Sequence, residues 1–286
     1  MTLRLNEVLS DSDVVLVHEW NLQELVAKIG REREQRRFAL FFHDTHHRSL
    51  TAREQMEAYD LRNYDGVLAF GKVLTDLYKN AGWAKRAWTW HEAADVRVFY
   101  PRRQVTQTTE LVWVGNWGDD ERAAEIKEFL VEPVRQLGVR AAAYGVRYPT
   151  PALAALSVAR IKYHGWIPNF KVPEVFAAGR ATIHVPRRPY ATALPGIPTI
   201  RIFEALACGT PLVSAFWSDS EELFHGGKDF LVARDGDEMK KHLKAVLTNP
   251  DLAQELAARG RETILSRHTC AHRVDELFQI HEELRS

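Results

Sequence analysis

Residues 199–213, with the sequence TIRIFEALACGTPLV, constrain the fold of this chain more than any other stretch. Their first half predicts a short amphipathic helix, and its small residues allow close packing. Gly209 can take the left-handed conformation that ends a helix, and Pro211 prevents the helix from continuing. The stretch therefore predicts a helix that turns directly into a buried strand, as in the repeating unit of parallel α/β proteins.

The start of this predicted helix carries two charged residues. A helix N-terminus presents backbone N–H groups that suit an anion, and Arg201 adds a full positive charge. Glu204, one turn further, can accept hydrogen bonds from vicinal hydroxyls. The pair indicates a ligand that contains a diphosphate and a ribose. The alternative is a helix, turn and strand of any α/β protein, without a ligand.

The composition sets the class of protein. The 286 residues are enough for two domains with their own cores. The formal net charge is zero, which gives no support for nucleic acid as the main partner. The only two cysteines, Cys208 and Cys270, lie far apart and predict a reducing compartment. The sequence shows no signal-peptide core and no transmembrane segment, so we expect a cytoplasmic protein.

Short β-branched or aromatic runs alternate with helical patterns, which predicts parallel strands with helices between them. The alternation pauses at a polar segment and then begins again. We therefore predict an α/β fold with an N-terminal domain over 1–95, a linker over 96–109 and a second domain over 110–267. A last helix is predicted within 268–286.

Two of the predicted helices depend on local signals. One covers residues 51–61, where Thr51 and Glu54 have the spacing of a capping box. The other is a continuous helix over 120–137.

The stretch around Arg201 closely resembles the donor-binding helix of GT-B-fold glycosyltransferases. The nearest resemblance is to the group 1 (family 4) enzymes and their spore-maturation CgeB-like relatives. The CgeB-like signature, RxFEAxACGTP, matches residues 201–211. Residues 163–168, YHGWIP, are similar to the family's loop beside the nucleotide base. The resemblance implies two facing Rossmann-like domains, the N-terminal one abbreviated, and a last helix that packs back toward the N-terminal domain.

The resemblance also implies the donor and its site. The donor would be a nucleotide-diphosphate sugar, and no cofactor is implied. Gly115 and Asn116 lie in a strand-to-helix turn that would touch the diphosphate, although a purely structural turn is the alternative. Trp166 would stack on the base or fill the core. The implied donor-binding residues are Gly115, Asn116, His164, Gly165, Trp166, Thr199, Ile200, Arg201 and Glu204.

Two departures from the family pattern concern charge. Many group 1 enzymes add an Arg and a Lys after the turn, but here only Arg122 is near and its spacing differs. We therefore expect Arg201 and Arg187 to meet the diphosphate charge. The alternative for Arg187 and Arg188 is a basic pair on the surface. The family's upstream Glu, eight residues before Glu204, is Gly196 here, which leaves the recognition of the sugar hydroxyls open.

In the first domain, His43 and Asp44 follow an apolar run that predicts a strand. The resemblance implies that this His faces the sugar and the leaving diphosphate, so the predicted catalytic residues are His43, Asp44 and Arg187. The alternatives are a solvated loop and a metal site that includes His46 and His47. We predict no metal, because a helical His-x-x-x-His with a distant carboxylate is absent.

Two other His-Glu pairs are candidates for acceptor contacts. His18-Glu19 follows the first predicted strand, and His91-Glu92 precedes the linker. A structural role is the alternative for both pairs.

The sequence thus predicts a hexosyltransferase-like enzyme that moves a sugar from a nucleotide-diphosphate sugar to an unknown acceptor, without metal and with retention. Family members carry roughly another half-domain before the first strand seen here. Truncation of the chain, a partner chain that supplies this half and a reduced acceptor side are the three explanations. The alternative function is a nucleotide-sugar-binding subunit or sensor without turnover. A sugar-nucleotide epimerase is disfavoured, because its catalytic residues cannot be placed.

Overall fold

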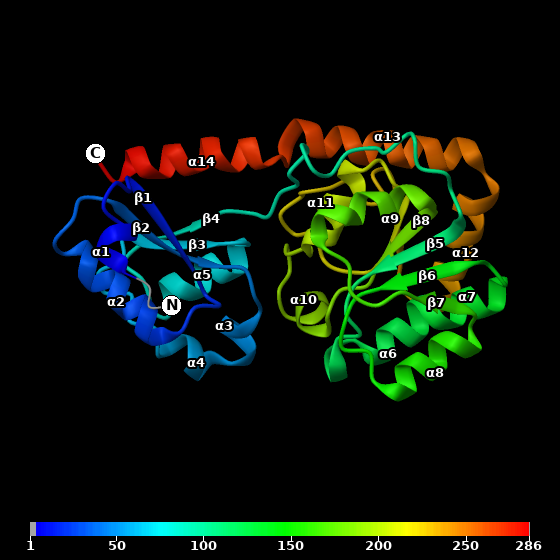
Figure 1. Cartoon of the computed structure of the whole chain (residues 1–286), viewed down its shortest axis with the longest axis horizontal. Helices are drawn as coiled ribbons and strands as arrows, with labels where there is room; N and C mark the ends of the chain where they lie inside the picture. Colours follow the sequence, from blue (N-terminus) through cyan, green and yellow to red (C-terminus); the bar gives the residue numbers. More distant parts are fainter. Residues whose placement is uncertain (1–3, 286) are drawn as a thin grey trace. The chain divides into compact units, whose positions relative to one another are not determined.

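The computed structural model describes residues 4–285, which form two compact units (Figure 1). The first unit contains the described residues up to Glu92 and those from Arg273 onward, and the second contains Ala93–His272. The segment predicted as a linker, 96–109, belongs to the second unit. Most of the C-terminal segment, 268–286, belongs to the first unit.

The first unit is built on a parallel sheet of four strands in sequential order. They are β1 (Val14–His18), β2 (Ala39–Asp44), β3 (Gly66–Ala69) and β4 (Ala87–Thr89). The residues of β2 are buried at five of six positions, as expected for a strand with neighbours on both sides. The helices are α1 (Leu5–Val8), α2 (Gln23–Arg33), α3 (Arg48–Thr51), α4 (Arg53–Glu57), α5 (Lys72–Asn80) and α14 (Cys270–Glu283).

The C-terminal helix α14 completes the core of the first unit. Ile280 lies in one buried cluster with Phe41 of β2 and Leu68 of β3. The indole Nε1 of Trp90 donates a hydrogen bond to the carbonyl oxygen of Arg273, at 2.8 Å. In Figure 1 the red helix α14 lies beside the blue and cyan strands of this sheet. The end of the chain therefore stabilises its beginning.

The second unit contains a parallel sheet of six strands in the order β10-β9-β8-β5-β6-β7. From β5 the chain runs outward to β7, returns to β8 beside β5, and then runs outward on the other side. The strand order therefore reverses between β5 and β8, where open α/β sheets bind ligands. The strands are β5 (Thr109–Val114), β6 (Ala141–Tyr144), β7 (Ile161–Tyr163), β8 (Gly179–His184), β9 (Leu212–Ala215) and β10 (Leu231–Ala233).

Both faces of this sheet are covered. Leu111 and Trp113 of β5 enter one hydrophobic cluster, and Val112 and Val114 enter another, because successive residues of a strand point to opposite faces. The covering helical elements are η1 (Asp119–Glu121), α6 (Ala123–Ile126), η2 (Lys127–Val131), α7 (Glu132–Leu137), α8 (Thr150–Val158), η3 (Asn169–Lys171), α9 (Val172–Ala178), α10 (Arg188–Thr192), α11 (Ile200–Ala207), α12 (Gly236–Thr248) and α13 (Pro250–Arg267).

The structure differs from the sequence-based predictions for the two helices over 51–61 and 120–137. The segment 51–61 holds only the end of α3 and the short α4, and the predicted capping box is wrong. The Thr51 hydroxyl instead contacts Nδ1 of His47, at 2.8 Å, because Ser and Thr side chains readily bond to nearby polar groups. The helix predicted over 120–137 is interrupted by the π-helical segment η2.

Gly145 allows the loops after β5 and β6 to approach closely. Its φ is 146°, and a Cβ at this position would lie 2.1 Å from the carbonyl oxygen of Gly115. Gly138 also has a positive φ, 66°, but a Cβ there would meet nothing within 4 Å. The two glycines are therefore a matched pair for substitution.

We expect Gly145→Ala to lower the free energy of unfolding by about 3 kcal/mol or more, because backbone must move. Gly138→Ala should lower it by only about 1 to 2 kcal/mol, the cost of a left-handed residue. Urea unfolding of both variants measures the difference, and equal losses would contradict the close-approach explanation.

Candidate functional site

Three arginines lie in segments that follow the carboxyl ends of β5 and β8, where the strand order reverses. Arg122 follows the turn after β5, Arg187 follows β8, and Arg201 lies in the first turn of α11. Burial, and then the positive charges of Arg187 and Arg201, lower the pKa of Arg122 to about 10. Like charges at close range destabilise one another, so this arrangement favours the binding of an anion.

Arg122 is the most buried of the three, with 9% of its surface exposed. Its guanidinium donates hydrogen bonds to the carbonyl oxygens of Asn116 and Val185, and Nε has no hydrogen-bond partner among the described residues. Gly118 leaves room for it, since a Cβ there would lie 2.8 Å from Cβ of Arg122. Spacing along the sequence had excluded Arg122 from the predicted site, whereas the fold includes it.

Arg187 and its neighbour Arg188 have different surroundings. Arg187 forms an ion pair with Glu121, at 2.7 Å, and its side chain is 21% exposed. Arg188 pairs with Glu125, at 2.8 Å, and its side chain is 50% exposed. Arg187 therefore belongs to the cluster of three arginines, and Arg188 lies outside it.

Arg201 and Glu204 contact each other and Asn169. The Arg201 guanidinium pairs with the Glu204 carboxylate and donates to Oδ1 of Asn169, at 2.9 Å. Nδ2 of Asn169 donates to Oε1 of Glu204, at 3.0 Å. Burial raises the pKa of Glu204, and the charge of Arg201 opposes this shift. The sequence analysis missed Asn169, although it directly follows the loop 163–168 that the resemblance had singled out.

The helix α11 begins beside a buried histidine. Thr199 precedes the helix, but its hydroxyl does not cap it and instead lies 2.9 Å from Nε2 of His184. Nδ1 of His184 lies 2.8 Å from the Ser214 hydroxyl. Burial lowers the pKa of His184 to about 3, so the imidazole is neutral at neutral pH. Thr199 therefore leaves the backbone N–H groups at the start of α11 uncapped by its side chain. Ile200, the first helical residue, is half-buried.

The predicted diphosphate turn is held by contacts with the next strand. Gly115 N–H donates to the carbonyl oxygen of Tyr144, at 2.9 Å, and Oδ1 of Asn116 accepts from Val146 N–H, at 3.0 Å. The Asn116 side chain thus has a structural contact. The turn itself lies at the carboxyl end of β5, next to Arg122.

The predicted base loop presents an exposed aromatic side chain. The His164 ring stacks on Tyr144 with a centroid separation of 4.6 Å. Gly165 has a φ of 76°, and its carbonyl oxygen accepts from Gly145 N–H, at 2.8 Å. Trp166 is 70% exposed, so the alternative that it fills the core is wrong.

A carboxylate lies against Gly196, where the family pattern has a Glu. A Cβ at Gly196 would be 2.5 Å from Oε1 of Glu221. Gly196 N–H also donates to the carbonyl oxygen of Ser218, at 2.7 Å, which ties the two loops together. A segment remote in sequence thus brings an acidic side chain to this position.

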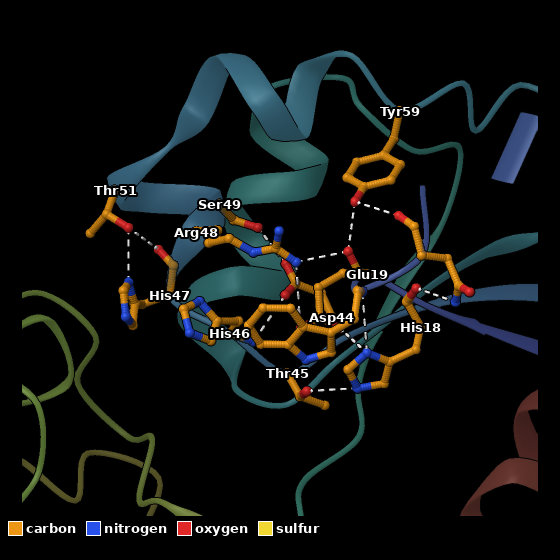
Figure 2. A network of polar contacts seen from close by, with 12 residues as sticks. His18, Glu19, Asp44, Thr45, His46, His47, Arg48, Ser49, Thr51 and Tyr59 are labelled. Atoms are coloured by element: carbon orange, nitrogen blue, oxygen red, sulfur yellow. Dashed lines mark hydrogen bonds and ion pairs between the residues drawn. The ribbon is translucent and has the colours of Figure 1, made fainter. Parts of the chain in front are cut away.

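In the first unit, Asp44 lies in a buried polar network (Figure 2). Its carboxylate accepts from Ser49, from the Tyr78 hydroxyl at 2.9 Å and from His46 N–H at 3.1 Å. Burial raises the pKa of Asp44 to about 6. Burial, with the nearby His18, lowers the pKa of His43 to about 4. The environment therefore favours the neutral form of both predicted catalytic residues.

Figure 2 also shows a chain of contacts from Glu19 through His18 to Thr45. Glu19 is fully buried, and its carboxylate lies 2.6 Å from Nδ1 of His18. Nε2 of His18 lies 2.9 Å from the Thr45 hydroxyl. Trp20 beside them is 60% exposed, with the Arg48 guanidinium 4.3 Å from its ring centroid. The carboxyl end of β1 therefore presents an imidazole and an indole.

Residues 4–285 contain neither a cluster of metal ligands nor a helix that could span a membrane. No group of three or more His, Cys, Asp or Glu side chains could hold a metal ion. Among the helices of these residues, none combines the length and apolar character that a bilayer span requires.

Comparison with known proteins identifies the family. Residues 122–279, more than half of the chain, match the family described as glycosyl transferase-like. The chain belongs to this family. No curated protein matches the sequence significantly.

Similar solved structures establish the GT-B fold. Sucrose-phosphate synthase from Thermosynechococcus elongatus has a TM-score of 0.70 and 14% identity, covering 98% of this chain and 76% of that chain. Anabaena HepE in complex with UDP has a TM-score of 0.71 and 15% identity, covering 98% of this chain and 81% of that chain. The T4 phage β-glucosyltransferase has a TM-score of 0.65 and 13% identity, covering 96% of this chain and 83% of that chain. The family membership and the fold together show a glycosyltransferase at a general level; its donor and a CgeB-like specificity stay predictions.

The opposite pKa shifts of Asp44 and His43 predict opposite effects on stability. Protonated Asp44 stabilises the folded protein, and this contribution is lost as the pH rises from about 4 to about 6. Neutral His43 also stabilises it, but that contribution is lost as the pH falls from about 6.5 to about 4. Each contribution is at most about 3 kcal/mol, so the two largely cancel.

Single variants should expose each contribution. Relative to wild type, Asp44→Asn should gain stability as the pH rises from 4 to 6, and His43→Gln should gain it as the pH falls from 6.5 to 4. Urea unfolding at several pH values gives both differences. Slopes of the same sign for the two variants would contradict the assigned shifts.

Proposed function

We propose that the second unit binds a nucleotide-diphosphate sugar and that the enzyme transfers its sugar to an acceptor hydroxyl without a metal ion. The observation that carries this proposal is the position of Arg122, Arg187 and Arg201, in the segments that follow β5 and β8 where the strand order reverses. Three guanidinium groups stabilise the negative charge that grows on the leaving diphosphate, which otherwise requires a metal ion. Retention of configuration, implied by the group 1 resemblance, is part of the proposal.

With the diphosphate at the three arginines, the ribose and the base of the donor lie next to Glu204 and the loop 163–168. Glu204 accepts hydrogen bonds from the ribose, and the loop with His164, Gly165 and Trp166 contacts the base. The exposed indole of Trp166 supports stacking, because an aromatic face is available. That HepE was solved with UDP supports a uracil nucleotide as the first ligand to test.

We assign the recognition of the sugar hydroxyls to Glu221. The carboxylate of Glu221 lies beside Gly196, only three residues before Thr199 and the start of α11. A carboxylate accepts hydrogen bonds from two vicinal hydroxyls. Glu221 would thus replace the Glu that the family pattern has at position 196.

The first unit is proposed to bind the acceptor. His18 supports this assignment, because its Nε2 already lies 2.9 Å from a hydroxyl, that of Thr45. His43 would contact substrate as a neutral imidazole, and Asp44 would act through the loop that it holds. A cytoplasmic location and a partner chain on the acceptor side stay predictions from the sequence.

Substitution of the adjacent arginines tests nucleotide binding. We expect Arg187→Ala to weaken the binding of UDP by about tenfold or more, since it removes one of three converging charges. Arg188→Ala should change it by less than about threefold, because an exposed ion pair outside the cluster contributes little. Isothermal titration calorimetry measures both, and equal effects would remove the basis for the anion site.

Substitution of the adjacent glutamates tests sugar recognition. Glu221→Ala should weaken the binding of UDP-glucose by about tenfold and leave the affinity for UDP unchanged, because it removes an acceptor for the sugar hydroxyls only. Glu222→Ala, an exposed neighbour, is the control and should bind both as wild type does. Loss of UDP affinity in Glu221→Ala would contradict the assignment.

Turnover separates the transferase from a binding subunit. Release of UDP from UDP-glucose by the full 286-residue chain supports the transferase. Binding without release, in the presence of a panel of acceptor sugars, would favour the subunit without turnover.

A further inference from the structure

We infer that Asn169 is a positioning residue that holds Glu204 for the ribose and so sets the preference for ribonucleotides. The inference rests on the proposed function, because it assumes that a nucleotide binds at α11. Asn169 lies outside α11, the helix that carries Arg201 and Glu204. Its contact with Glu204 explains how this buried carboxylate can pair first with Arg201 and then with a ribose hydroxyl.

The orientation of the Asn169 amide is determined by its neighbours. A carboxylate only accepts hydrogen bonds and a guanidinium only donates them. Nδ2 must therefore face Glu204, at 3.0 Å, and Oδ1 must face Arg201, at 2.9 Å. A rotation of the amide by 180° would break both hydrogen bonds, so the side chain has one arrangement.

Glu204 needs this contact because it is buried. Only 2% of the residue is exposed, and its carboxylate contacts the side chains of Arg201 and Asn169. A buried carboxylate that loses its partners is strongly destabilised. The position of the Glu204 carboxylate therefore depends on its contacts with Arg201 and Asn169.

Arg201 has a second partner when a diphosphate binds. Its side chain is 31% exposed, whereas that of Glu204 is 3% exposed, so an incoming anion reaches the guanidinium first. The phosphate charge weakens the Arg201 pairing with Glu204. Asn169 then keeps Oε1 of Glu204 in place, and Oε2 becomes available to a ribose hydroxyl. Arg201 thus exchanges partners while Asn169 does not.

Asn169 also connects this carboxylate to the predicted base loop. It opens η3, directly after the loop 163–168. The other end of the loop is attached to the sheet through the hydrogen bond from Gly145 to Gly165, at 2.8 Å. The loop that would contact the base and the carboxylate that would contact the ribose are therefore held in one fixed relation.

The experiment compares three ligands by isothermal titration calorimetry: UDP, 2′,3′-dideoxy-UDP and inorganic pyrophosphate. Wild type should bind UDP more tightly than 2′,3′-dideoxy-UDP by about tenfold to a hundredfold, the range expected for hydrogen bonds to a charged group. Asn169→Leu should reduce this ratio at least about fivefold by weakening UDP alone. Lys171→Ala, an exposed residue of the same short helix, should keep the wild-type ratio.

Asn169→Asp provides a second variant of the same size. It can still accept from Arg201 but cannot donate to Glu204 as a carboxylate, so it should lose the ratio as Asn169→Leu does. An unchanged ratio in both variants would overturn the inference. Equal weakening of all three ligands would also overturn it, because a merely structural role predicts that result. Absence of UDP binding to wild type would instead refute the proposed function itself, and the inference with it.

Discussion

The burial of one guanidinium group, that of Arg122, is the constraint on which the site in the second unit depends. Arg122, Arg187 and Arg201 come from three separate segments, and burial first, then the positive charges of Arg187 and Arg201, lower the pKa of Arg122. Such an arrangement disfavours the empty protein, and an anion bound among them relieves the repulsion. The hydrogen bonds of Arg122 to backbone carbonyl oxygens keep it in place without neutralising its charge.

The sheet topology explains why these charges meet. The strands β5 and β8 are adjacent although β6 and β7 lie between them in sequence, so the loops that follow β5 and β8 share one edge. Gly145 allows the loop after β6 to come close to the loop after β5, and Gly118 leaves room for Arg122, because a side chain at either position would collide with backbone or with Arg122. The site is thus a consequence of parallel strand order and of two positions without side chains.

In the first unit, ionisable groups at the strand ends are buried in a network of hydrogen bonds. Burial raises the pKa of Asp44 to about 6 and lowers that of His43 to about 4, and the fully buried carboxylate of Glu19 contacts Nδ1 of His18. The polar network in Figure 2 therefore places hydrogen-bonding groups at the strand ends. This chemistry suits hydroxyl groups, whereas the second unit suits phosphate.

The sequence by itself determined the fold class and the helix that carries Arg201 and Glu204, because hydrophobic periodicity, Gly209 and Pro211 are local signals. It also predicted the alternation of parallel strands and helices, but not the interruption η2 or the failed cap at Thr51. Only the tertiary structure brought Arg122, Asn169 and Glu221 to the site. Their positions depend on strand order and loop contacts between residues far apart in the chain, which local patterns do not encode.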